Sequence, residues 1–233
     1  MPGRPMTIER GCGWYGKLPS AGDFVGRGSR SRNKALDLWL SDGFARARQM
    51  PSVPSAASPI WNFALPSIAL DGSAMLGVFA PSEDRVGRKY ALVAWLDYHA
   101  GAGNLALCER GDGFYRGLGP ALACAVAGEI NAEALTAKLH ELAHEFNPHC
   151  EDAAEMAPEA SDILDVLMPD GDQCTVPLID ALSPWPDLPR RFNIAADTSF
   201  WWRNPARPGL PMAIEHHGPL NADLLLSLLK TGA

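Results

Sequence analysis

The most suggestive catalytic pattern in this sequence is the H-E-x-x-H string formed by His140, Glu141 and His144. On a helix, this spacing places two imidazoles on one face, where they can bind zinc, and supplies a Glu as general base. The apolar positions of the same segment form a stripe at Leu135, Leu139, Leu142 and Phe146. Both histidines project well away from that stripe, toward water instead of a dry cleft. We therefore expect no metal site here and keep a zinc-dependent hydrolase as the rival hypothesis.

Other catalytic templates fit the sequence less well. Ser20 lies in Leu18-Pro-Ser-Ala-Gly22, which lacks the first glycine of a nucleophile elbow. No phosphate-binding G-x-x-x-x-G-K-[ST] string occurs, and the close glycine pairs lack the third glycine of a dinucleotide loop. We interpret His216-His217 as a surface turn. The sequence thus predicts a protein without enzymatic activity and without a cofactor.

Composition and charge restrict the class of partner. The chain has 233 residues, of which 47% are hydrophobic and 20% charged, which suits a globular protein with a sizeable core. The net charge of −7 conceals a gradient, from an excess of five positive charges in residues 1–50 to an excess of twelve negative charges in residues 129–182. The overall negative charge disfavours nucleic acid as the main ligand.

The local basic patch at Arg27, Arg30, Arg32 and Lys34 admits two interpretations. It is either a solvated loop and helix start, or a docking surface for an acidic partner or for the chain's own acidic segment. No apolar run approaches membrane-spanning length, and the first residues lack the apolar core of a secretory signal. The five scattered cysteines include no C-x-x-C pair, which indicates reduced thiols. Together these features predict a cytoplasmic protein that does not insert into membranes.

Hydrophobic periodicity predicts a single α/β domain over residues 1–233. The expected strands are 12–18, 60–65, 74–80, 90–96, 192–202 and 211–214. The expected helices are 36–47, 113–128, 131–146 with Asn131 as its N-cap, and 221–229. A loop is expected at 19–32, and an acidic, irregular excursion at about 147–190 with some helix near 162–168. The connections between the middle strands are too short for helical crossovers, so the sheet should be largely antiparallel or mixed. We expect helices to cover both of its faces.

Three stretches together resemble one known family. They are WYGKLPSAGDFV at 14–25, WNFAL at 61–65 followed by GVFAPSEDRVGR at 77–88, and SFWW at 199–202. Their order and spacing resemble the TagF (ImpM) family of type VI secretion-associated proteins, within residues 12–100 and again at 199–202. The resemblance implies a three-layer α/β/α sandwich likened to longin-type domains. It also implies a non-enzymatic cytoplasmic accessory protein that restrains assembly after translation by binding a forkhead-associated scaffold protein.

The charged residues of these motifs are candidates for partner binding or for structural roles. Lys17 belongs to the first string, and Asp23 either forms an Asx-type turn or offers an exposed acceptor. Asp84, Arg85 and Arg88 lie between two predicted strands. They form either an internal Arg–Asp fork, helped by the permissive backbone of a neighbouring glycine, or a partner surface. For Asp23 and for the Asp84–Arg88 segment alike, the sequence permits a structural role and a partner-binding role.

The aromatic residues supply most of the expected core. We expect five tryptophans to be buried: Trp14, Trp39, Trp61, Trp95 and Trp201. Trp202 alternates with Trp201 on a predicted strand, so one of the two should face outward, and that residue or a cover over it is a candidate interface anchor. Phe24 and Arg27 are further candidates for partner contact. The predicted docking surface combines the basic N-terminal loop with exposed aromatic residues, and its affinity should depend on salt.

Overall fold

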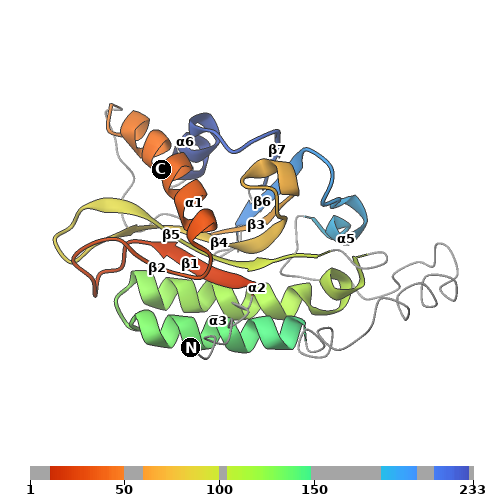
Figure 1. Cartoon of the computed structure of the whole chain (residues 1–233), viewed down its shortest axis with the longest axis horizontal. Coiled ribbons are helices and arrows are strands. Elements are labelled where there is room, and N and C mark those ends of the chain that lie inside the picture. The colour runs from red at the N-terminus through yellow and green to blue at the C-terminus, as the bar shows by residue number, and fades with distance from the viewer. Residues whose placement is uncertain (1–10, 50–59, 100–103, 148–184, 204–212, 231–233) are drawn as a thin grey trace, which may run out of the picture.

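A seven-stranded antiparallel sheet organises the molecule (Figure 1). The computed structural model describes residues 11–49, 60–99, 104–147, 185–203 and 213–230. The strands are β1 (Cys12–Gly16), β2 (Val25–Arg27), β3 (Trp61–Leu65), β4 (Met75–Glu83), β5 (Lys89–Asp97), β6 (Thr198–Arg203) and β7 (Ala213–His217). Their order across the sheet is β2-β1-β5-β4-β3-β6-β7, and every neighbouring pair is antiparallel. The β4–β5 connection is a short hairpin, whereas helical segments lie between β2 and β3 and between β5 and β6 in the chain.

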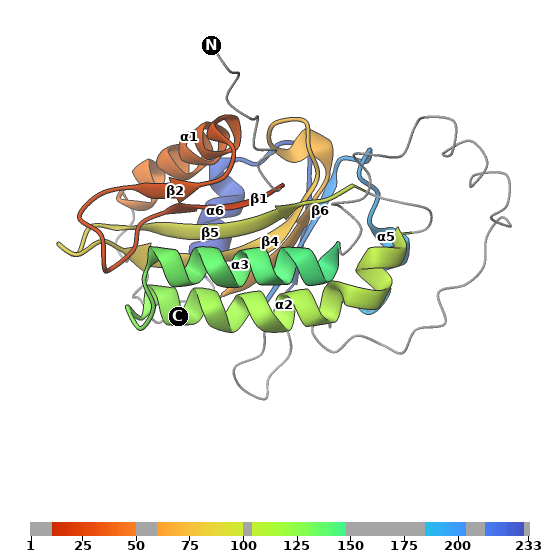
Figure 2. The same cartoon turned by 60° about the horizontal axis from the view of Figure 1, so that its bottom comes forward.

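Helices cover both faces of the sheet (Figure 2). One face carries α1 (Arg30–Ala47) and α6 (Ala222–Lys230), and the other carries α2 (Leu105–Val126) and α3 (Ala132–Phe146). The remaining helical segments are η1 (Ser67–Ala69) and α5 (Leu188–Arg191). The expected three-layer α/β/α sandwich is therefore confirmed, and the sheet is antiparallel throughout the described residues.

Each strand alternates its side chains between two apolar clusters, one on each face of the sheet. Trp201 packs in the cluster beneath α1 and α6, while Trp202 packs against Tyr115 of α2 with ring centroids 4.8 Å apart. Both tryptophans are 0% exposed. The prediction that one of them faces outward is wrong, because helices bury both faces at this strand. Trp202 is a core residue, and it is not an exposed anchor for a partner.

Most predicted elements are present, with differences at their ends. The five tryptophans expected in the core are all buried. The amide oxygen of Asn131 accepts the N–H of Ala134 at 2.9 Å, so it caps α3 as predicted. The loop expected at 19–32 contains the edge strand β2 and the first turn of α1. The predicted start of α2 is eight residues late, because burial of Leu107 and Cys108 outweighs the low helix propensity of its glycines.

Some predictions lie outside the described residues. They include most of the acidic excursion at 147–190, its predicted helix near 162–168, Cys150 and Cys174. Of the described cysteines, Cys12, Cys108 and Cys124 are not in disulfide bonds. Among the described segments, none of the helices has the length and apolar character needed to cross a bilayer.

Candidate partner-binding groove

The two charged motifs meet at one end of the sheet, where the loop after β1 lies against the tip of the β4–β5 hairpin. The Lys17 ammonium donates to Asp84 Oδ2 at 2.9 Å, and Arg88 Nε donates to the same oxygen at 2.7 Å. The backbone N–H groups of Val86 and Arg88 donate to Asp84 Oδ1 at 3.1 and 2.9 Å. The side chain of Lys17 is only 6% exposed, and that of Asp84 is fully buried. We call Lys17, Asp84 and Arg88 the clamp.

Hydrogen bonds to the backbone fasten the loop to the hairpin around the clamp. The N–H of Arg85 donates to the carbonyl oxygen of Ala21 at 2.9 Å, and Arg88 Nη2 donates to that of Gly22 at 2.6 Å. The Ser82 hydroxyl donates to the carbonyl oxygen of Lys17 at 2.7 Å. The clamp and these bonds therefore hold two segments together that are about sixty residues apart in the chain.

Two motif glycines make this geometry possible. Gly16 has φ +144 and approaches the carbonyl of Ala91 so closely that a Cβ would overlap it. Gly87 has φ +80 in the hairpin turn, where its N–H donates to the carbonyl oxygen of Asp84 at 2.8 Å. Side chains are strained at such φ values, so the motif needs glycine at both positions.

The clamp contains the Arg–Asp pair predicted between Arg88 and Asp84. Lys17 is a second cation on the same carboxylate, and Arg85 contributes its backbone while its side chain is exposed. Burial raises the pKa of Asp84, but the hydrogen bonds from Lys17, from Arg88 and from backbone amides outweigh it and hold that pKa well below its usual range. Asp84 is consequently an ionised anchor at neutral pH.

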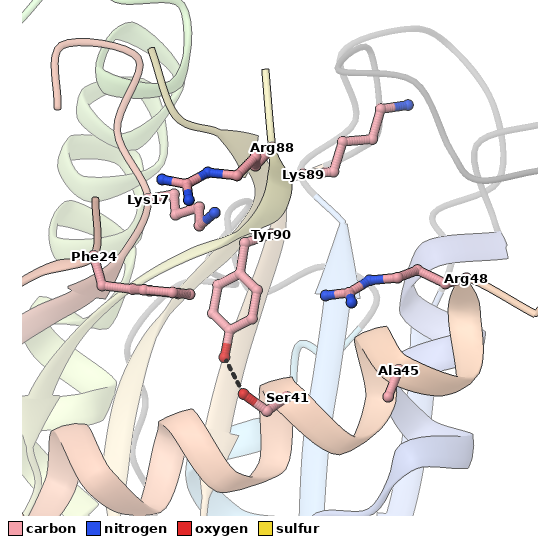
Figure 3. A pocket seen from close by; sticks show the side chains of 8 residues that line it. All are labelled: Lys17, Phe24, Ser41, Ala45, Arg48, Arg88, Lys89 and Tyr90. Carbon is pink, nitrogen blue, oxygen red and sulfur yellow. Dashed lines mark hydrogen bonds between the residues drawn. The ribbon is translucent and has the colours of Figure 1, made fainter. Parts of the chain in front are cut away.

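A groove of about 820 Å³ opens to solvent beside the clamp (Figure 3). The groove is lined by residues of the β1–β2 loop, of α1 and its C-cap, and of the segment that enters β5. These eight residues are Lys17, Phe24, Ser41, Ala45, Arg48, Arg88, Lys89 and Tyr90. Figure 3 shows the Tyr90 ring in the middle, with Lys17, Arg88 and Phe24 on one side of it and Arg48 on the other. Among the described side chains that line it, four are cationic and none is a carboxylate.

The Phe24 ring is held in place although 43% of the residue is exposed. It contacts Tyr90 edge to face, with centroids 4.8 Å apart, and stacks on Tyr15 at 6.0 Å. The Lys17 ammonium lies 4.8 Å from its centroid, at cation–π distance. The groove thus presents a positioned aromatic surface next to positive charge.

Two tyrosines beneath the groove are locked as hydrogen-bond donors. The Tyr15 and Tyr90 hydroxyls donate to Asp37 Oδ1 at 2.7 and 3.1 Å, and the Tyr90 hydroxyl also bonds the Ser41 hydroxyl at 3.2 Å. Burial and the neighbouring Asp37 carboxylate raise the pKa of both phenols. Both remain protonated at neutral pH and position the aromatic wall against α1.

The remaining candidates on the N-terminal segment are at the surface. Asp23 is exposed, and its carboxylate accepts the N–H of Phe24 at 2.8 Å. This bond gives Asp23 a local turn contact and leaves its carboxylate accessible. Arg27 is exposed, donates to the carbonyl oxygen of Gly26 at 3.0 Å and lies 5.9 Å from the Trp14 ring.

Only three of the four residues in the predicted basic patch are exposed. Arg27, Arg30 and Lys34 are exposed, but Arg32 is buried. Its guanidinium pairs with Asp97 at 2.6 Å and with Asp71, since its position on the inner face of α1 points it at the strand ends. Arg32 is a structural cation and contributes nothing to the exposed patch.

Sequence reasoning missed the part of the groove that α1 and β5 provide. Ser41, Ala45 and Arg48 recur at i, i+4 and i+7, so they share one helix face, and this spacing was a usable signal. Lys89 and Tyr90 follow the second motif directly. Their convergence with Phe24 depends on the register of β1 and β5, which the sequence does not specify.

The H-E-x-x-H residues lie on α3 and face solvent, as predicted. His140, Glu141 and His144 are all exposed, and Glu141 pairs with Lys138 at 2.8 Å. Within the described ranges, no three metal-ligating side chains gather into a possible metal site. His216 and His217 lie on β7 and not in the expected surface turn, and His217 Nδ1 is 3.6 Å from the Asp197 carboxylate.

Fold and site together define an α/β/α protein in which two motifs build a basic, aromatic groove. Residues 13–142 match the family described as TagF N-terminal domain, type VI secretion system-associated, and the chain belongs to that family. The match contains the clamp and the groove and extends the predicted resemblance through most of α3. The chain is thus a type VI secretion-associated protein.

One solved structure supports the same architecture. PA0076 from Pseudomonas aeruginosa PAO1 superposes with a TM-score of 0.62 at 22% sequence identity, over 95% of each chain. At that identity the likeness shows the fold alone. Among curated proteins, none matches this sequence.

Proposed function

We propose that this chain is a non-enzymatic, cytoplasmic regulator of type VI secretion that acts after translation. It restrains assembly by binding a forkhead-associated scaffold protein of the same system. The observation that carries this proposal is the convergence of the two family motifs on one surface feature. Their buried charges fasten the loop to the hairpin, and their exposed residues surround a groove.

The chemistry of the groove favours binding over catalysis. The clamp carboxylate is ionised and accepts four hydrogen bonds, so it is a poor proton carrier, and the two tyrosines retain their protons. The rival zinc hydrolase would use His140, Glu141 and His144, which are exposed on α3 and lack the dry cleft that such chemistry needs.

The proposal is tested by capture from the native cytosol of a bacterium that carries the secretion system. The tagged chain should retain the forkhead-associated scaffold, and raising salt from about 50 mM to about 500 mM should reduce its recovery, because exposed charges are screened. A variant with Arg27, Arg30 and Lys34 changed to Glu tests the patch without disturbing buried Arg32. Absence of the scaffold from the captured proteins would contradict the function, and salt-independent recovery would contradict its electrostatic part.

A further inference from the structure

We propose that Phe24 is the side chain through which this chain anchors its partner, and that Lys17 is the positioning residue that holds the Phe24 ring. The inference rests on the proposed function, in which the partner is the forkhead-associated scaffold. The two roles are separable, because the hold of Lys17 on Phe24 can be measured without the scaffold.

Phe24 differs from the other large apolar residues that are exposed on the described part of the chain. Its ring contacts Tyr15, Tyr90 and the Lys17 ammonium, although 43% of the residue is open to solvent. An exposed side chain ordinarily keeps its rotamer freedom, so this ring has lost that freedom before a partner arrives. Rigid aromatic residues of this kind are typical binding hot spots. The exposed group as a whole is Phe24, Leu38, Ile68, Val86 and Leu105, of which Phe24 is the aromatic member.

The positive charge of Lys17 exceeds what the clamp needs. Arg88 already balances the charge of Asp84, whose carboxylate also accepts two backbone N–H groups. Lys17 adds a second cation to the same carboxylate, although its side chain is only 6% exposed. Burying an ammonium group costs free energy unless its donors are satisfied. The clamp alone therefore does not account for a lysine at this position.

The Phe24 ring accounts for it. An ammonium group has three N–H donors, and within the described residues one oxygen, Asp84 Oδ2, accepts from Lys17. The same ammonium lies 4.8 Å from the centroid of the Phe24 ring, and Figure 3 shows Lys17 between Arg88 and Phe24. A cation over an aromatic ring is attracted by the ring quadrupole, and the attraction is strongest where water is excluded. Lys17 thus connects the buried carboxylate to the half-exposed ring.

The backbone of the loop is fixed independently of the Lys17 side chain. The Lys17 N–H donates to the carbonyl oxygen of Ala91 at 3.0 Å, and its own carbonyl oxygen accepts the Ser82 hydroxyl. Further along the loop, Arg88 Nη2 donates to the carbonyl oxygen of Gly22. Substitution of the Lys17 side chain should therefore leave the loop in place and change mainly the hold on the ring.

Fluorine NMR of the intact chain labelled with para-fluorophenylalanine tests the positioning without a partner. The Phe24 resonance is identified by its absence from the Phe24→Leu variant. Lys17→Met keeps most of the side-chain volume and should shift that resonance toward its position in the unfolded chain, as should the second neutral variant, Lys17→Gln. Arg85→Met is the matched control, because Arg85 is an exposed cation of the same hairpin, and it should leave the resonance unchanged.

Calorimetric titration with the purified scaffold tests the anchor. Phe24→Ala should weaken the complex about tenfold or more, and Lys17→Met about threefold or more. When the two changes are combined, Lys17→Met should weaken binding no further, because Lys17 acts through the ring. Leu38→Ala is the matched control, since Leu38 is apolar and 64% exposed on α1, and it should bind like the wild type. Thermal melts establish that each variant is folded.

Each contrary result overturns a stated part of the inference. Full affinity of Phe24→Ala, or an equal loss in Leu38→Ala, refutes the anchor and leaves the proposed function intact. An unchanged Phe24 resonance in both Lys17 variants, or the same loss from Lys17→Met with and without the ring, refutes the positioning role. Failure of the wild type to bind the scaffold refutes the proposed function and the anchor with it, while the NMR measurement still decides whether Lys17 positions Phe24.

Discussion

Replacing Arg32 by Met tests how α1, which supplies one side of the groove, is held on the sheet. Arg32 lies in the first turn of α1 and pairs with Asp71, in the turn before β4, and with Asp97, at the end of β5. Methionine keeps much of the side-chain volume and removes the charge. The helix would then lose its ionic contact with both strand ends.

The burial of the three side chains determines how much stability Arg32→Met should lose. The side chain of Arg32 is 3% exposed, and those of Asp71 and Asp97 are 19% and 20% exposed. Removing one partner of a buried ion pair costs about 3–5 kcal/mol, and the residual hydration of both carboxylates places this case at about 3 kcal/mol. For a protein of this length, that loss lowers the melting temperature by about 6–12 °C.

The loss should depend on pH in a defined direction. Burial raises the pKa of Asp97, and Arg32 opposes that rise, so Arg32→Met raises this pKa further. A carboxyl group with a raised pKa holds its proton more tightly in the folded state, so stability falls as pH rises from the ordinary pKa through the raised one. The deficit of the variant relative to the wild type should therefore shrink between pH 7 and about pH 4.

Denaturant unfolding of both proteins at the two pH values measures this effect. Arg46→Met is the control: Arg46 is on the same helix and has two acidic partners, Asp42 and Asp223, but its side chain is 55% exposed. The free energy of unfolding of Arg46→Met should fall by less than about 1 kcal/mol. Equal losses for the two variants, or a deficit of Arg32→Met that does not shrink at low pH, would show that the Arg32 ion pairs do not hold α1 on the sheet.

Three further predictions concern the α2 and α3 face. Asn131→Ala should lower the stability measured by thermal unfolding by about 1 kcal/mol, because it removes the cap of α3. Asn131→Ser should retain most of the wild-type stability, since serine is also a good N-cap. Equal stability of the wild type and both variants would show that the cap is dispensable. Trp202→Ala should cost about 3–5 kcal/mol, as expected of a core residue, and a cost below about 0.5 kcal/mol would return Trp202 to the surface. Elemental analysis of the purified protein should find substoichiometric zinc. The double variant His140→Ala/His144→Ala should differ from the wild type by less than about 0.5 kcal/mol in the free energy of unfolding. One zinc per chain that is lost in the double variant would instead support the zinc hydrolase.

Local patterns in the sequence were sufficient for most of the elements and for the Asp84–Arg88 pair. The apolar spacing of α1, the cap at Asn131 and the opposite charges of Asp84 and Arg88 are properties of neighbouring residues. Such features depend on helical periodicity and short-range hydrogen bonding.

Features that depend on distant segments could not be predicted in the same way. Alternation correctly separates Trp201 from Trp202, but only the packing of α2 against β6 decides that the second is also buried. Arg32 belongs to a basic run in the sequence, yet its partners Asp71 and Asp97 are brought to it by the sheet. Exposure of a charged residue is set by such long-range contacts.

Isothermal titration calorimetry of the purified chain with the purified forkhead-associated scaffold measures whether this protein acts on the scaffold by binding alone. We expect a saturable complex that weakens as salt increases, with both proteins recovered at unchanged mass. Absence of a complex, or a change in scaffold mass that a single side-chain substitution in this chain abolishes, would show that binding is not how this chain acts.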